Sequence, residues 1–199
     1  MRAILRPAII LFVFLTVLTG VVYPLVVTGI AAVVFPHQAR GSIVVRDGAP
    51  IGSELIGQSF SNPKYFWSRP SATSPQPYNG TSSGGSNLGP LNPALTDAVK
   101  ARIQALVAAD PGNHAPVPVD LVTSSASGLD PDISVAAAQY QMARVARTRQ
   151  LQLSAVQELV KTHSQGRLWG VLGEPRINVL ELNLALDNLD MRRMSTRTP

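Results

Sequence analysis

The 199-residue sequence contains no cysteine and few charged residues. The missing cysteine excludes disulfides, thiolate metal sites and a cysteine nucleophile, and it fits either side of a bacterial membrane. Charged residues make up 15% of the chain, whereas soluble domains carry about 25%. The three histidines lie far apart and match no metal-ligand spacing. The sequence therefore predicts no metal site.

Signatures of catalysis and of nucleic-acid binding are also missing. The chain has neither a Gly-x-x-x-x-Gly-Lys phosphate loop nor a Gly-x-Ser-x-Gly nucleophile elbow. Its 17 Lys and Arg residues exceed its 12 Asp and Glu residues, but they are scattered rather than gathered with aromatics. Residue chemistry alone thus favours an anchored accessory or binding module, with no catalytic residue, no cofactor of its own and no nucleic-acid partner.

The shortage of charge is concentrated in one apolar run from Ala8 to Phe35. These 28 residues hold no Asp, Glu, Lys, Arg or His, and roughly 20 helical residues suffice to cross a bilayer core. A fully soluble protein is excluded unless the run is removed, and a multi-span channel is excluded altogether. Because the apolar part of a signal peptide is only about 7–15 residues long, we favour a permanent anchor. Cleavage after Ala31 is the alternative.

Charge hardly distinguishes the two sides of this span. Arg2 and Arg6 precede it, and Arg40 and Arg46 follow it. The short segment before the span favours an internal N-terminus. We therefore expect a cytoplasmic tail over 1–7, a single transmembrane helix over 8–35 in the inner membrane, a periplasmic domain over 36–190 and a disordered tail over 191–199.

Small residues within the span predict contact with another membrane helix. Thr16 and Gly20 are four residues apart, as are Thr28 and Ala32, and such pairs allow close helix approach. Pro24 should kink the helix. The residues expected to pack against a partner helix are Thr16, Gly20, Pro24, Thr28 and Gly29. Since small residues are common in membrane helices, ordinary composition explains them equally well.

The remaining residues predict one compact α+β domain. Its expected elements are a hairpin around Asp47-Gly48, an ordered loop over 59–93, a helix from Asn92-Pro93 to Asp110, a strand over 117–123, a helix over 134–149, a helix from a capping box at 154–157 to Gly166, and a helix over 178–189. The last segment also fits the alternation of a strand.

The loop over 59–93 is the candidate functional region. Of its 35 residues, 24 are Gly, Pro, Ser, Thr or Asn, yet it holds five of the chain's eleven aromatic residues. Since disordered segments are poor in aromatics, we expect it to be ordered. The run from Ser82 to Gly89 could bind an anion through backbone N–H groups, although a tight structural turn explains it better.

Two charged motifs have structural explanations that we prefer. Asp130 and Asp132 flank Pro131 and could bind a cation, but Asp before Pro is ordinary turn chemistry. Arg144, Arg147 and Arg149 suit the negative end of their predicted helix.

Five stretches resemble the C subunit of the bacterial Kdp potassium-transporting P-type ATPase. They are YPLVVTGIAAVVFPHQARGSI (23–43), GSELIGQSFSNPKYFWSRPSA (52–72), SSGGSNLGPLNPAL (82–95), VPVDLVTSSASGLDPDIS (117–134) and GEPRINVLELNLAL (173–186). They follow the family order over nearly the whole chain, and SSGGSNLGP together with GLDP is specific to it.

The resemblance implies an accessory subunit of a four-subunit potassium uptake pump. Its implied partners are a channel-like potassium-binding subunit, a P-type subunit that hydrolyses ATP, a small single-helix subunit and the lipid bilayer. The family is also described as a catalytic chaperone that raises the ATP affinity of the hydrolysing subunit. Because the domain is expected outside the cytoplasm, we expect ATP to act only through that subunit.

We hypothesise that the loop docks the domain on the channel-like subunit. The docking residues would be Phe60, Tyr65, Phe66, Trp67, Ser83, Gly84, Gly85, Ser86 and Asn87. Aromatic side chains often anchor interfaces, and glycines allow close backbone approach. The aromatic rings could instead fill the domain's own core. The rival functions are a membrane-tethered periplasmic hydrolase that uses Ser83 or Ser86, and a free binding module.

Overall fold

A computed structural model of the protein describes residues 2–195, which divide into one unit up to Ile51 and a second unit from Gly52. The first unit contains α1 (Arg2–Val17), the π-helical turn η1 (Leu18–Val22), α2 (Tyr23–Val34), the short α3 (Pro36–Ala39), β1 (Ile43–Arg46) and most of β2 (Ala49–Ser53). The second contains α4 (Pro93–Ala109), the 3-10 turn η2 (Val119–Leu121), β3 (Asp132–Ser134), α5 (Val135–Thr148), α6 (Leu153–Thr162), β4 (Ser164–Gln165), β5 (Arg176–Asn178) and α7 (Val179–Ser195).

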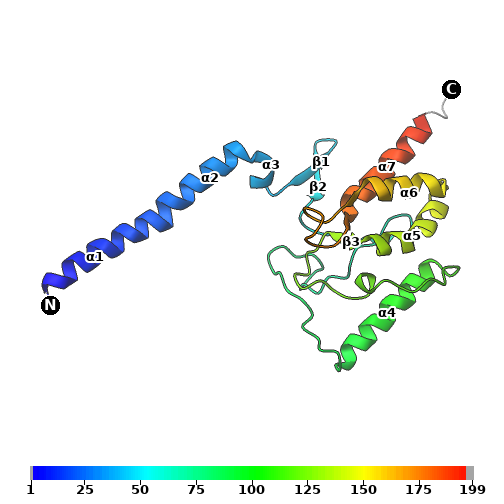
Figure 1. Ribbon diagram of the computed structural model, residues 1–199, viewed down its shortest axis with the longest axis horizontal. Helices are drawn as coiled ribbons and strands as arrows, with labels where there is room; N and C mark the ends of the chain where they lie inside the picture. Colours follow the sequence, from blue (N-terminus) through cyan, green and yellow to red (C-terminus); the bar gives the residue numbers. More distant parts are fainter. Residues whose placement is uncertain (1, 196–199) are drawn as a thin grey trace. The chain divides into compact units, whose positions relative to one another are not determined.

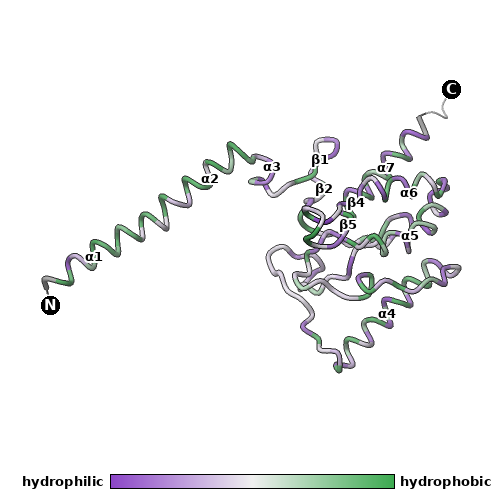
Figure 2. The backbone as a smooth tube through the Cα atoms, in the orientation of Figure 1, coloured by the Kyte–Doolittle hydropathy of each residue, from purple (hydrophilic) through white to green (hydrophobic). Residues whose placement is uncertain are grey.

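The apolar run forms one long helix through α1, η1 and α2 (Figure 1). Within the helix Ile4–Val34, an 18-residue stretch has a mean hydropathy of 2.6 and none of it is buried, so the helix is long and apolar enough to cross a membrane. The hydropathy colouring of Figure 2 follows this helix as a mostly apolar segment. The predicted single span is present as a helix of suitable length.

The predicted hairpin is confirmed. β1 and β2 form a two-stranded sheet joined by Asp47 and Gly48, whose φ angles are +52° and +79°. Two positive φ angles in a two-residue connection match the twist of the strands, and Gly adopts such angles without steric cost.

A three-stranded antiparallel sheet and three helices enclose the core of the second unit. The strand order is β3-β5-β4, and Ile133 on β3 pairs with Ile177 on β5. Both isoleucines are almost completely buried. Helix α5 packs on α6, and α6 packs on α7, which bury Val145, Ala146, Val156, Val160, Leu182 and Leu186. The fold is a mixed arrangement of helices and sheet, as predicted.

The loop over 59–93 has no helix or strand before α4, yet it is ordered by contacts with the rest of its unit (Figure 1). At its end, the Asn92 side chain accepts a hydrogen bond from the N–H of Ala94, and Pro93 occupies the first helical position. This is the predicted start of α4. The helix over 134–149 is also confirmed, with the Ser134 hydroxyl accepting a hydrogen bond from Ala137. Residues 179–189 are helical within α7, whereas Asn178 ends β5.

The predicted strand over 117–123 is wrong. Val119–Leu121 form a 3-10 turn, and Pro118 before it offers no N–H to a strand ladder. The Asp120 carboxylate accepts hydrogen bonds from the N–H and hydroxyl of Ser134, at 2.8 and 3.1 Å. The two hydrogen bonds hold the 3-10 turn against Ser134, and the next residue, Leu121, is buried in the core.

The predicted capping box is also wrong. Helix α6 starts after Gln152, so Ser154 is an exposed residue inside its first turn. The helix ends at Thr162 rather than at Gly166, and a short strand follows. At the C-terminal end, α7 continues to Ser195 through part of the expected disordered tail, while 196–199 lie outside the described residues.

Candidate functional site: the loop over 59–93 and its supports

Two buried amide side chains hold the aromatic part of the loop. Asn183 on α7 accepts a hydrogen bond from the N–H of Phe66 at 2.9 Å and donates to its carbonyl at 3.0 Å. Gln141 on α5 forms the same two hydrogen bonds with Trp67: its side chain accepts from the N–H at 2.8 Å and donates to the carbonyl at 3.2 Å. Each amide thus satisfies both backbone groups of one loop residue, as a neighbouring strand would.

The side chains of Asn183 and Gln141 form an amide clamp on the loop, and a buried arginine adds to it. Arg144 donates hydrogen bonds to the carbonyls of Pro63 and Tyr65 and to the Gln141 side chain, and its guanidinium lies 4.8 Å from the centre of the Trp67 ring. Burial lowers its pKa to about 10, so it remains protonated at neutral pH. The proposed interaction with the helix C-terminus is therefore not its main role: Arg144 binds the loop.

Two further arginines, in the last turn of α5 and just after it, also bind specific groups. Arg147 forms an ion pair with Asp110, at the end of α4. Arg149 pairs with Asp187 and Asp190 of α7. Burial alone would lower the pKa of Arg149, but the hydrogen bonds to these carboxylates outweigh it and raise that pKa.

The structure separates the predicted docking residues into buried and exposed groups. Phe66 is completely buried in the core, so its ring cannot touch a partner. Phe60 and Trp67 are half-buried and pack against the same core. Tyr65 lies under the Arg149 guanidinium and donates a hydrogen bond to Asp187. The aromatic rings therefore serve mainly to order the loop.

The Gly-Ser part of the loop lies against residues 125–128 of its own chain. The N–H of Gly84 and the hydroxyl of Ser83 both donate to the carbonyl of Ser127, at 2.9 and 3.0 Å. A Cβ on Gly85 would lie 2.9 Å from the Ala126 carbonyl oxygen. Close backbone approach does explain this glycine, but the approaching backbone belongs to the same chain.

Four neighbouring positions remain available at the surface. Ser83, Ser86 and Asn87 are exposed, and a Cβ on Gly84 would meet no atom within 4 Å. These four are the most accessible of the predicted docking residues, and in the sequence they lie about 20 residues after the part of the loop that the amide side chains hold.

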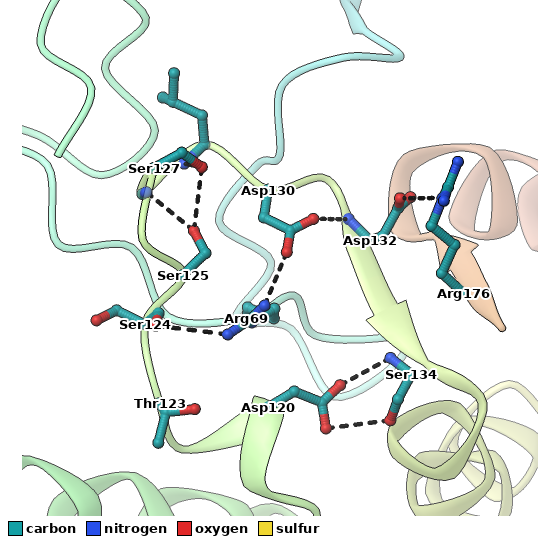
Figure 3. A network of polar contacts seen from close by, with 12 residues as sticks. Arg69, Asp120, Thr123, Ser124, Ser125, Ser127, Asp130, Asp132, Ser134 and Arg176 are labelled. Atoms are coloured by element: carbon teal, nitrogen blue, oxygen red, sulfur yellow. Dashed lines mark hydrogen bonds and ion pairs between the residues drawn. The ribbon is translucent and has the colours of Figure 1, made fainter. Parts of the chain in front are cut away.

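The Asp130-Pro131-Asp132 motif is a structural turn (Figure 3). Asp130 accepts a hydrogen bond from the N–H of Asp132 at 3.0 Å and pairs with Arg69 at 2.8 Å. Asp132 pairs with Arg176 at 2.9 Å, and burial raises its pKa. Both carboxylates thus have cationic partners, and the described residues contain no group of three metal-ligating side chains. The hydrogen bond from the Asp132 N–H to the Asp130 side chain is typical of an Asx turn, here at the start of β3.

A groove of about 350 Å³ lies beside the amide clamp. Its wall includes Phe60, Trp67, Tyr78, Arg69 and Arg102. Each guanidinium is already engaged, Arg69 by Asp130 and Arg102 by the carbonyl of Val122 at 2.7 Å. The groove is amphipathic. The Asp130 carboxylate neutralises Arg69, whereas the carbonyl of Val122 holds Arg102 without neutralising its positive charge.

The long apolar helix contains the π-helical turn η1, whereas the sequence predicted only a kink at Pro24. Tyr23 donates its N–H to the Leu18 carbonyl, five residues back, so the π-helical turn ends immediately before Pro24. In a regular α-helix, Thr16 and Thr28 would lie about 120° apart. The wider turn accommodates one extra residue, about 100° of rotation, which reduces this separation to about 20°. The two predicted small-residue pairs therefore share one face.

Gly20 and Gly29 leave open space along this helix, because a Cβ on either would meet no atom within 4 Å. Thr19 hydrogen-bonds its hydroxyl to the Leu15 carbonyl at 2.7 Å, which satisfies that polar group within the span. The predicted packing residues thus remain accessible to another helix.

Sequence reasoning missed the side chains that hold the loop. Gln141 and Asn183 were expected only as ordinary positions on helices, and Arg144 only as a cation at the C-terminal end of its helix. Their one signal is a polar residue on the apolar face of a predicted helix: Asn183 sits one residue after the core residue Leu182 and three before Leu186. Such a residue needs a buried hydrogen-bond partner.

Sequence comparisons match known proteins over almost the whole chain. The family model described as K+-transporting ATPase, c chain (KdpC) matches residues 5–188. The potassium-transporting ATPase KdpC subunit of Variovorax paradoxus is 67% identical over 187 residues, covering 94% of this chain and 97% of that one. The corresponding subunit of Dechloromonas aromatica is 65% identical over 189 residues, covering 95% and 99%. The chain therefore belongs to the KdpC family, the c chains of the K+-transporting ATPase.

Proposed function

We propose that this chain is a non-catalytic accessory subunit that assembles and stabilises a potassium uptake pump. The observation that carries the proposal is family membership over residues 5–188, which includes both the apolar helix and the folded domain. The partners would be the channel-like potassium-binding subunit, the ATP-hydrolysing P-type subunit and the small single-helix subunit.

The chemistry of the loop supports an assembly role over a hydrolase. Ser83 donates its hydroxyl to the carbonyl of Ser127 rather than to a base, and a serine nucleophile needs a base within hydrogen-bond reach. Ser83 is thus a structural residue of the loop, and its neighbours Ser86 and Asn87 are available for contact.

We place the domain on the periplasmic side of the inner membrane. The absence of cysteine makes the test clean, because one introduced cysteine is the only thiol in the chain. Leu91→Cys, at a side chain that is 97% exposed, should react with a membrane-impermeant maleimide in intact spheroplasts. A cysteine at Ala3, before the span, should react only after lysis, and the reverse pattern would overturn the orientation.

We further propose that the surface around Gly84 docks on the channel-like subunit. A matched pair of substitutions tests this, because a Cβ meets no atom within 4 Å at either Gly84 or Gly112. Gly84→Arg would put a bulky charged side chain into the proposed interface. It should reduce co-purification of the other subunits from detergent about 30-fold or more, which corresponds to about 2 kcal/mol of lost binding. Gly112→Arg, in the turn after α4, should not. Equal recovery with both variants would reject this docking surface.

The proposed effect on ATP affinity is indirect. The N–H of Gly84 and the hydroxyl of Ser83 are both engaged by the Ser127 carbonyl, so these two groups are not open to a phosphate. We expect ATP affinity of the pump to fall in Gly84→Arg only in proportion to lost assembly. Photo-crosslinking of an azido-ATP probe to this chain in the intact pump would instead establish direct contact.

A further inference from the structure

A second surface, an apolar turn between β4 and β5, is unusually exposed. Its side chains Leu168, Trp169, Val171 and Leu172 are 59, 84, 76 and 53% exposed. Other exposed large apolar side chains in the described part of this unit are separated along the chain. We propose that this turn inserts into the interfacial layer of the bilayer that holds the chain's own helix, an inference that rests on the membrane anchoring in the proposed function.

The backbone of the turn suits a poorly hydrated environment. Leu168 and Leu172 exchange hydrogen bonds at 2.8 and 3.0 Å, and the N–H groups of Gly170 and Val171 bond to the carbonyls of Arg167 and Leu168. In lipid, each unpaired backbone group is costly because no water replaces its partner. A turn that already satisfies four of its N–H groups can leave water with little penalty.

The turn directs its tryptophan outward by an uncommon conformation. Trp169 and Gly170 have φ angles of +53° and +75°. Positive φ is rare for a bulky residue and is found where the surroundings or a function require it. Trp169 has little contact with its own domain, so packing within the domain does not account for it. Tryptophan is also the side chain that prefers the membrane–water interface.

Charges limit the depth of insertion. Arg167 donates to both carboxylate oxygens of Glu174, at 3.0 Å each, across the base of the turn. This neutral pair lies just outside the apolar residues, where it can stay among hydrated headgroups. The pattern of apolar tip and charged base matches a shallow, interfacial position rather than a deep one.

The tether keeps the second unit near the bilayer. Seventeen residues, 35–51, join the end of α2 to the second unit, and they span at most about 55 Å if fully extended. The tether is shorter than this limit because it contains α3 and the β1–β2 hairpin. A domain of this size has a radius of gyration of about 15 Å, so such a tether holds it close to the bilayer. Anchoring makes insertion intramolecular, which lets a weak apolar contact persist.

The experiment uses the fact that the chain has only two tryptophans. The full-length Trp67→Phe chain, in which Trp169 is the sole tryptophan, is reconstituted into vesicles of phosphatidylethanolamine and phosphatidylglycerol with or without dibromo-phosphatidylcholine. Brominated acyl chains quench tryptophan at the membrane interface, and we expect about twofold or greater quenching. The matched control Trp169→Phe retains half-buried Trp67 and should be quenched little. Circular dichroism confirms that both variants are folded.

Emission of Trp169 that is typical of water and unaffected by bromine would overturn the proposal. So would quenching that is equal in the two variants. A third variant, Trp169→Ser, separates lipid from protein: it should still co-purify with the other subunits. If it does not, the turn binds a subunit and the bilayer proposal is wrong, while the accessory function itself stands.

Discussion

Replacing Asn183 by alanine should destabilise the second unit by about 3 kcal/mol. The side chain is 2% exposed and bonds both the N–H and the carbonyl of Phe66. Its loss leaves two buried backbone groups without partners, each costing about 1–3 kcal/mol. Better helix propensity of alanine recovers only about 0.5 kcal/mol. For a chain of this length, the melting temperature should fall by about 6–12 °C.

The assay is urea unfolding of the full chain in detergent, followed by tryptophan fluorescence. Gln157→Ala is the matched control, because it removes an amide from an exposed position of α6 and should change the free energy of unfolding by less than about 0.5 kcal/mol. Hydrogen exchange adds a local readout: the Phe66 amide should exchange much faster in Asn183→Ala, and the Trp67 amide, held by Gln141, should change less.

Asn183→Asp tests whether both ends of the amide matter. A protonated carboxyl group can still donate to the Phe66 carbonyl, whereas a carboxylate would face that oxygen with a buried negative charge. Burial would raise the pKa of this carboxyl group, so the variant should be most stable in acid and lose stability as pH rises through that pKa. If Asn183→Ala behaves like Gln157→Ala, or Asn183→Asp shows no such pH dependence, the amide does not hold the loop.

Three further predictions concern the same region. Gly85→Ala should cost about 1–3 kcal/mol by overpacking against the Ala126 backbone, whereas Gly84→Ala, which meets open space, should be neutral or slightly stabilising; equal melting temperatures would contradict this. Burial raises the pKa of Tyr78. In urea titrations, the free energy of unfolding of the chain relative to the Tyr78→Phe variant should therefore be largest below pH 10 and decline at higher pH. A difference between the two chains that does not change with pH would refute this. Trp67→Ala removes a half-buried ring at the edge of the core, so it should lower the free energy of unfolding by about 3 kcal/mol and lower the melting temperature. An unchanged melting temperature would instead support a role for Trp67 in docking.

Local chemistry explains which parts of the fold could be predicted from the sequence. Asp47-Gly48 requires a tight turn, Asn92-Pro93 starts a helix, and Ser134 caps another, because each signal acts through neighbouring backbone groups. The alternation over 117–123 misled for the complementary reason. Its proline lacks a ladder N–H, and a distant partner, Ser134, holds Asp120 in a turn.

The sequence by itself determined the long apolar helix, the order of the loop and the family, since these depend on composition and on stretches of adjacent residues. Only the tertiary structure decided that Phe66 is buried, that Asn183 and Arg144 hold the loop from elements about 80 to 120 residues away, and that Gly85 packs on its own chain. The physical reason is that burial and hydrogen-bond pairing are properties of residues brought together by folding. A ring or a glycine looks the same in the sequence whether it meets a partner or its own core.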